Sequence, residues 1–170
     1  VNGTGQNATD AKIGDTLKFT LASTIPDMSA YNTYTFNFKD TLSKGLTFGQ
    51  VDSVKVGDTA LTTDTDYTVA TAPADNGKTL LTVTMKNFKN QQANVGKKIT
   101  VTYTATLNKD AVVGGAGNVN SATIQYSNNP STNGTGESEP SKVRVFTYGF
   151  TVDKYTGKNY DDTATRLACA

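Results

Sequence analysis

The sequence predicts an all-β protein built as an antiparallel sandwich. Threonine, valine and tyrosine are abundant, and these residue types favour strands. Short segments in which apolar and polar side chains alternate recur along the chain, separated by turn sequences such as "IPD", "SKG", "DNG" and "GGAG". Strands with turns at this spacing are typical of an immunoglobulin-like, Greek-key β-sandwich, and a closed barrel is the weaker alternative.

The alternating pattern places the expected strands in order along the chain. They cover residues 16–23, 33–40, 51–56, 66–71, 78–88, 97–107, 121–127 and 142–150. Short helical turns are expected at 24–31 and 107–115, and a surface loop at 131–141. Residues 151–170 start a new alternating pattern but are too few to bury a core of their own. We therefore predict a domain at residues 1–150, followed at 151–170 by a linker and the first strand of another domain, in a chain that is a fragment.

The composition excludes several classes of function. The chain has 16 basic and 15 acidic residues, which offers no clustered positive charge for nucleic acid or an anionic membrane. No apolar run approaches the length of about 18 residues that spans a bilayer. Histidine is absent and Cys169 is the one cysteine, so an internal disulfide, a Ser-His-Asp triad and the common zinc sites are excluded. No cofactor or metal is expected.

Asp40 stands out in the segment "TYTFNFKD". Counted in steps of two, it continues the aromatic row of Tyr34, Phe36 and Phe38, which is the face expected to point into the core. Ionised carboxylates are rarely buried without a partner. Either the strand ends at Phe38 and Asp40 begins a turn, or Asp40 is a buried functional acid.

Asn120 raises the same question in the segment "NSATIQYSNNP". It heads the row that continues with Ala122, Ile124 and Tyr126, and Asn118 lies one step earlier on the same face. The alternative is an amide that only satisfies loop backbone. If a lysine joined the acid and the amide in an apolar site, its neutral amine could attack the Asn carbonyl while the acid moved protons. Ammonia would leave and an isopeptide bond would remain.

The chain resembles a known family at this point. It is similar to the isopeptide-forming D2 domain of Gram-positive, sortase-assembled pilins. The stretches that carry the resemblance include "AKIGDTLKFTLASTIPD", "YTFNFKDTLSKGLTF", "ITVTYTATLNKDAVVG", "NSATIQYSNNP" and "KVRVFTYGFTVDK". They follow one another in the family's order over nearly the whole chain. The tail, "FTVDKYTGKNYDDTATRLACA", resembles the first strand of the Cna-B-type domain that commonly follows.

The resemblance implies roles for particular residues. Asp40 corresponds to the acid that promotes the bond, and Asn120 to the asparagine that forms it, with Asn118 as second choice. The family's lysine lies on a strand upstream of Val1, and Lys12 is the substitute within the chain. Lys154 would form the bond of the following domain. Cys169 stands where the Cna-B-type pattern has glycine.

The resemblance also implies a function without substrate turnover. We expect a structural module of an extracellular, cell-wall-anchored pilus, with neighbouring pilin subunits as partners through sortase linkage. An adhesin module that binds a host matrix or surface ligand is the alternative, although loops rich in glycine, asparagine, serine and threonine favour the scaffold. A glycan-processing enzyme would need two carboxylates beside a cleft, and only Asp40 has an inward position.

Overall fold

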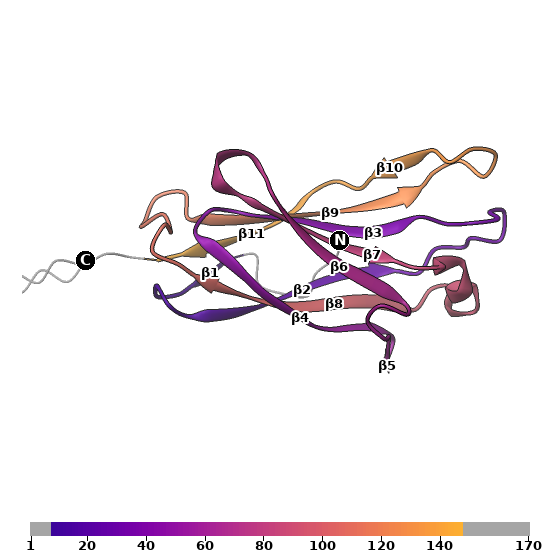
Figure 1. Ribbon diagram of the computed structural model, residues 1–170, viewed down its shortest axis with the longest axis horizontal. Helices are drawn as coiled ribbons and strands as arrows, with labels where there is room; N and C mark the ends of the chain where they lie inside the picture. The colour runs from indigo at the N-terminus through magenta and orange to yellow at the C-terminus, as the bar shows by residue number, and fades with distance from the viewer. Residues whose placement is uncertain (1–7, 148–170) are drawn as a thin grey trace, which may run out of the picture.

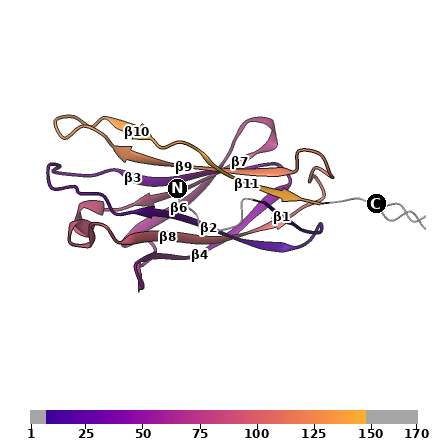
Figure 2. The same cartoon turned by 180° about the vertical axis from the view of Figure 1, so that it is seen from behind.

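The computed structural model describes residues 8–147, which form two β-sheets packed face to face (Figures 1 and 2). The strands are β1 (Ala8–Asp10), β2 (Thr16–Thr24), β3 (Phe36–Leu42), β4 (Leu46–Val56), β5 (Thr59–Ala60), β6 (Tyr67–Pro73), β7 (Thr79–Met85), β8 (Lys98–Leu107), β9 (Asn118–Ser127), β10 (Thr135–Glu137) and β11 (Ser141–Phe146). Two short 3-10 helices, η1 (Asp75–Gly77) and η2 (Phe88–Asn94), flank β7. The first sheet has the order β1-β11-β9-β3-β7-β6, with β10 on β9, and the second has the order β2-β8-β4-β5.

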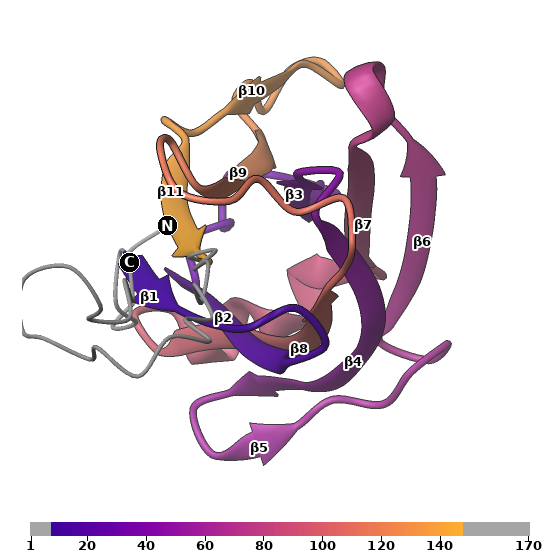
Figure 3. The ribbon, with the colours of Figure 1, turned by 90° about the vertical axis from the view of Figure 1, so that its left-hand side faces the viewer.

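The predicted sandwich is confirmed. The pairings between these strands are antiparallel, except that β1 runs parallel to β11 at one edge of the first sheet. Seen end-on, the two sheets lie on opposite sides of the core, and they do not join into the closed barrel that was the alternative (Figure 3). Every segment that the sequence predicted as a strand overlaps a strand of the structure.

The predicted helical turns are wrong. Residues 24–31 and 107–115 contain turns but no helix, while the 3-10 helices lie at η1 and η2. Backbone hydrogen bonds to other segments hold both stretches: Ile25 donates to the Lys97 carbonyl (2.9 Å), and Asn108 donates to the Gly45 carbonyl (2.9 Å). The expected loop at 131–141 also contains a strand, since β10 pairs with β9.

The core lies between the two sheets and follows the period of two. The inward row of β8 is fully buried and consists of Ile99, Val101, Tyr103, Ala105 and Leu107. In the opposite sheet β3 and β7 contribute Phe36, Phe38, Leu81 and Val83. Burying a large apolar side chain stabilises a fold by about 1.5–3 kcal/mol, so these rows hold the sheets together.

The register of β3 against β9 positions two polar side chains within this core. Leu42 lies opposite Asn120, and Asp40 lies opposite Ala122. Asp40 and Asn120 point to the same face of the sheet and are therefore diagonal neighbours on adjacent strands. The residue that faces them comes from β8 in the second sheet.

Candidate functional site

Asp40 lies inside β3 and is completely buried. The strand continues through Asp40 to Leu42, with Phe36, Phe38, Asp40 and Leu42 all on the inner face. The interpretation in which the strand ends at Phe38 is therefore wrong. A carboxyl group placed at the centre of a sandwich loses its hydration, and that loss has to be offset by partners.

Tyr103 of β8 joins Asp40 to Asn120 from across the sandwich. Its hydroxyl donates to Asp40 Oδ2 at 2.5 Å and accepts a hydrogen bond from Asn120 Nδ2. All three residues are buried, with 0% of Asp40, 0% of Tyr103 and 3% of Asn120 exposed. The structure thus brings together the acid and the amide that the sequence singled out, and it adds a phenol between them.

Packing holds the Tyr103 ring in place. It stacks on Phe19 of β2, with ring centroids 5.3 Å apart and planes at 16°, and lies against Phe48 of β4 at 6.0 Å. Both neighbours come from strands that pair with β8, so the ring is fixed by its own sheet. The hydroxyl is consequently aimed at the opposite sheet with little freedom.

Two acceptor atoms of this cluster have no hydrogen-bond partner. They are Asp40 Oδ1 and Asn120 Oδ1, and in the described part of the chain Ser43 Oγ is the other buried side-chain atom in that state. An unpaired buried polar atom costs about 1–3 kcal/mol. Because both atoms of the cluster are acceptors, the group that would satisfy them is a donor, and an amine fits that requirement.

Burial controls the charge of the cluster. Loss of hydration raises the pKa of Asp40 to about 6, although the hydrogen-bonding groups of Tyr103 and Asn120 act in the opposite direction. Burial also raises the pKa of Tyr103, and the neighbouring charge of Asp40 adds to that effect. The phenol therefore remains protonated, and Asp40 takes up a proton more readily than an ordinary aspartate.

Asn118 is equally buried but has a different environment. Its Oδ1 accepts from the Val112 backbone N–H at 2.8 Å, and its Nδ2 donates to the carbonyls of Val112 (3.0 Å) and Val145 (3.2 Å). The amide therefore fastens the segment after β8 to β9 and β11. Its hydrogen bonds are already used by backbone, whereas the Asn120 carbonyl oxygen has no partner.

The remaining predicted residues lie elsewhere. Lys12 is exposed in the turn before β2, where its backbone N–H donates to Asp15 Oδ2 at 2.9 Å, and it is not part of the buried cluster. Lys154 and Cys169 lie outside the described residues, as do Val1 and the proposed domain boundary after residue 150.

Tyr103 is the residue that the sequence reasoning missed. It lies in the alternating segment "KKITVTYTATL", where it occupies an inward position between Val101 and Ala105. A hydroxyl in an otherwise aliphatic row was the available signal, because a buried phenol usually needs a hydrogen-bond partner.

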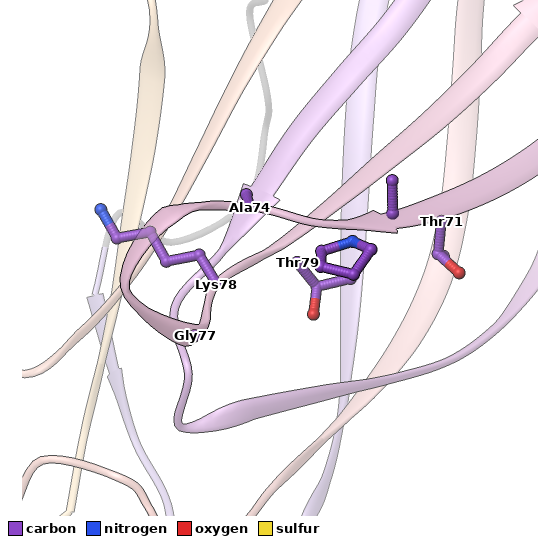
Figure 4. A pocket seen from close by; sticks show the side chains of 7 residues that line it. Thr71, Ala74, Gly77, Lys78 and Thr79 are labelled. Carbon is purple, nitrogen blue, oxygen red and sulfur yellow. The ribbon is translucent and has the colours of Figure 1, made fainter.

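Two surface hollows lie elsewhere on the described residues. One shallow hollow lies at the β6–β7 turn, where the Lys78 side chain extends away from Thr71 (Figure 4). Another lies between residues 31–33 and 130–133. Neither includes a residue of the buried cluster. Within residues 8–147 no group of three or more acidic or cysteine side chains could hold a metal, and no helix is long and apolar enough to cross a membrane.

Comparisons with known proteins agree with this architecture. Residues 13–130 match the family described as Gram-positive pilin backbone subunit 2, Cna-B-like domain. No curated protein matches the sequence. Among solved structures, the chain is similar to a C-terminal fragment of the major pilin GBS80 of Streptococcus agalactiae, with 26% identity and a TM-score of 0.72 over 95% of this chain and 57% of that one.

Two further pilins show the same likeness. Domains D2 and D3 of the major pilin SpaD of Corynebacterium diphtheriae share 29% identity, with a TM-score of 0.59 over 79% of this chain and 47% of that one. The pilus backbone RrgB of Streptococcus pneumoniae shares 29% identity, with a TM-score of 0.56 over 71% and 26%. The chain thus spans less than two thirds of the length of each of these three pilin chains.

Proposed function

The chain belongs to the family of Gram-positive pilin backbone subunits, and from that premise we propose that it is a structural module of a cell-surface pilus shaft, stabilised by an autocatalytic Lys–Asn isopeptide bond. Its partners in this proposal are neighbouring pilin subunits, joined by sortase and anchored to the cell wall. The module turns over no substrate in this proposal. Each molecule reacts a single time, because the lysine and the asparagine that form the bond belong to the protein itself.

The observation that carries this proposal is the pair of unpaired acceptors, Asp40 Oδ1 and Asn120 Oδ1, on diagonal neighbours within the core. A lysine amine directed at that point would satisfy both atoms. Its nitrogen would then lie beside the Asn120 carbonyl carbon, which is the atom it must attack. Burial disfavours the charged amine, and burial also raises the pKa of Asp40 to about 6, so both groups are shifted towards the reactive state.

Geometry supports Asn120 over Asn118 as the asparagine that forms the bond. The asparagine that reacts has to release its side-chain nitrogen as ammonia. The side-chain nitrogen and oxygen of Asn118 are both held by hydrogen bonds to the backbone of neighbouring segments. Lys12 is exposed, and its backbone is fixed in a turn by Asp15. For the nucleophile we therefore propose, as the family resemblance implies, a lysine on a strand upstream of Val1.

Intact-mass measurement tests the proposal. The chain of residues 1–170 should have its full sequence mass, whereas a chain extended upstream through the next lysines should be lighter by one ammonia. Asp40→Ala and Asn120→Ala in the extended chain should restore the full mass. Asn37→Ala is the matched control, since Asn37 lies three residues before the acid on β3 but pairs with Gln125 on the outer face (3.0 Å) and should not affect the loss.

Stability gives a second readout. Closing most of the domain into a covalent loop should stabilise the extended chain by about 2–5 kcal/mol, the range known for loop-closing cross-links, and Asn120→Ala should remove that gain. Full mass in the extended chain would refute the bond. Loss of ammonia in residues 1–170 alone would show that a lysine of this chain is the nucleophile.

A further inference from the structure

We propose that Tyr103 is a catalytic proton relay, whose hydroxyl carries a proton from Asp40 to the nitrogen that leaves Asn120. This inference rests on the proposed isopeptide reaction and assigns a third residue to it. Tyr103 qualifies as catalytic because its oxygen contacts Asn120 Nδ2, the atom that departs as ammonia.

The two oxygens of Asp40 face different partners. Oδ2 is 2.5 Å from the Tyr103 hydroxyl, while Oδ1 has no partner. The hydrogen-bonded path from the acid to Asn120 Nδ2 therefore passes through the phenol oxygen. The free Oδ1, like the free Asn120 Oδ1, is left for the incoming amine. In this arrangement Asp40 Oδ1 accepts the proton of the attacking amine, and Asp40 Oδ2 supplies, through Tyr103, the proton of the leaving nitrogen.

This arrangement allows a complete transfer of protons. At the start the amine is neutral and Asp40 carries its proton on Oδ2. In this protonated state Oδ2 donates to the Tyr103 oxygen, which reverses the hydrogen bond that Tyr103 donates to the ionised carboxyl group. The amine nitrogen attacks the Asn120 carbonyl carbon. Its excess proton passes to Asp40 Oδ1 while Oδ2 releases its own proton to Tyr103, so the acid never holds two protons. In the same transfer Tyr103 gives its hydroxyl proton to Nδ2, and the carbon–nitrogen bond to Nδ2 then breaks.

The products balance the reactants. One ammonia leaves, one secondary amide forms, Tyr103 regains its proton, and Asp40 ends neutral with the proton on Oδ1. No oxidant, metal or external base is needed. In the tetrahedral intermediate the leaving nitrogen has a lone pair, so the hydrogen bond that Asn120 Nδ2 donates to Tyr103 in the resting state can reverse its direction at that stage.

The environment of Tyr103 suits a relay. A neutral phenol can donate and accept at the same time, and burial keeps this one neutral. Stacking on Phe19 and the contact with Phe48 hold the hydroxyl in position without competing for its proton. An amide nitrogen is a poor leaving group, so a proton delivered to it is the step at which catalysis is needed.

The experiment compares rates of ammonia loss in the extended chain. The chain is produced by cell-free synthesis, and its intact mass is followed over time. Tyr103→Phe should remain folded, because it keeps the ring, but should lose ammonia about 10²–10⁴-fold more slowly, the usual contribution of proton transfer. Tyr67→Phe is the matched control: Tyr67 is also buried and its hydroxyl accepts from Thr63 Oγ1 (2.7 Å), but it lies on β6, away from the cluster.

A fluorinated series separates a relay from a residue that only positions Asn120. Fluorotyrosines at position 103 keep the shape and the hydrogen bonds but lower the phenol pKa stepwise, so a relay predicts rates that change steadily along the series. Equal rates for Tyr103→Phe and the wild type, or rates independent of fluorination, would overturn the relay. A wild-type extended chain that keeps its full mass would instead overturn the bond itself, and the relay with it.

Discussion

Replacing Asp40 by asparagine should stabilise the unbonded chain of residues 1–170 above neutral pH and have little effect in acid. The side chain is completely buried in β3, and the substitution keeps its shape and an oxygen that can accept from Tyr103. No ion pair with Asp40 is found among the described residues, and the neighbouring Lys39 points to the outer face, where it pairs with Glu137 at 3.0 Å. The titratable group that faces Asp40 is Tyr103.

The size of the effect follows from the pKa of Asp40. In the unfolded chain it has the ordinary value of 3.8, and in the folded chain burial raises the pKa to about 6. Between these values the unfolded chain releases its proton while the folded chain keeps it, so folding stability falls as pH rises. The difference of about 2.2 in pKa corresponds to about 3 kcal/mol, fully lost above pH 6 and fully present below 3.8.

Thermal unfolding at several pH values provides the assay. The melting temperature of Asp40→Asn relative to wild type should rise by about 6–12 °C between pH 3.5 and pH 8, using about 2–4 °C per kcal/mol for a chain of this size. Asp58→Asn is the control, because Asp58 is exposed in the turn between β4 and β5 and should show no such trend. A difference between variant and wild type that stays constant with pH would refute the buried, destabilising charge.

Two predictions concern the hydrogen bonds by which Asn118 holds the backbone of Val112 and Val145. Asn118→Ala should destabilise the fold by at least about 2 kcal/mol in urea unfolding, because it leaves the backbone groups of Val112 and Val145 without their buried partner. A loss of stability near zero would contradict that role. Gly45→Ala should cost about 1–3 kcal/mol in the same assay, since the added methyl would lie 2.6 Å from the Ala111 Cα and would also meet Asn118 Oδ1; unchanged stability would show that this backbone can move aside.

Periodicity was sufficient to find the eight longer strands and the two inward polar residues. A period of two assigns each side chain to a face, so Asp40 and Asn120 could be recognised as interruptions of apolar rows. Periodicity does not give the register between strands, and the diagonal contact of the two residues depends on Leu42 pairing with Asn120. That contact was expected only through the family resemblance.

Other features were beyond the reach of the pattern for physical reasons. Tyr103 reaches the cluster from the second sheet, and strand alternation does not say which rows of two sheets meet. The strands β1, β5 and β10 have only two or three residues each, too few to show a period. The distinction between Asn118 and Asn120 depends on the backbone of residues 112 and 145, which fold close to β9 only in the assembled domain.

The parallel pairing of β1 with β11 has a mechanical consequence. Ala8 lies beside Arg144 and Asp10 beside Phe146, so the first and last described strands run side by side in the same direction. Tension that pulls these two strands outward, one towards its amino end and the other towards its carboxyl end, slides them past each other. The hydrogen bonds of the pair are then loaded together in shear, and they cannot be opened one at a time as in an unzipped hairpin. The edge of the first sheet is thus arranged to share a stretching force among its bonds.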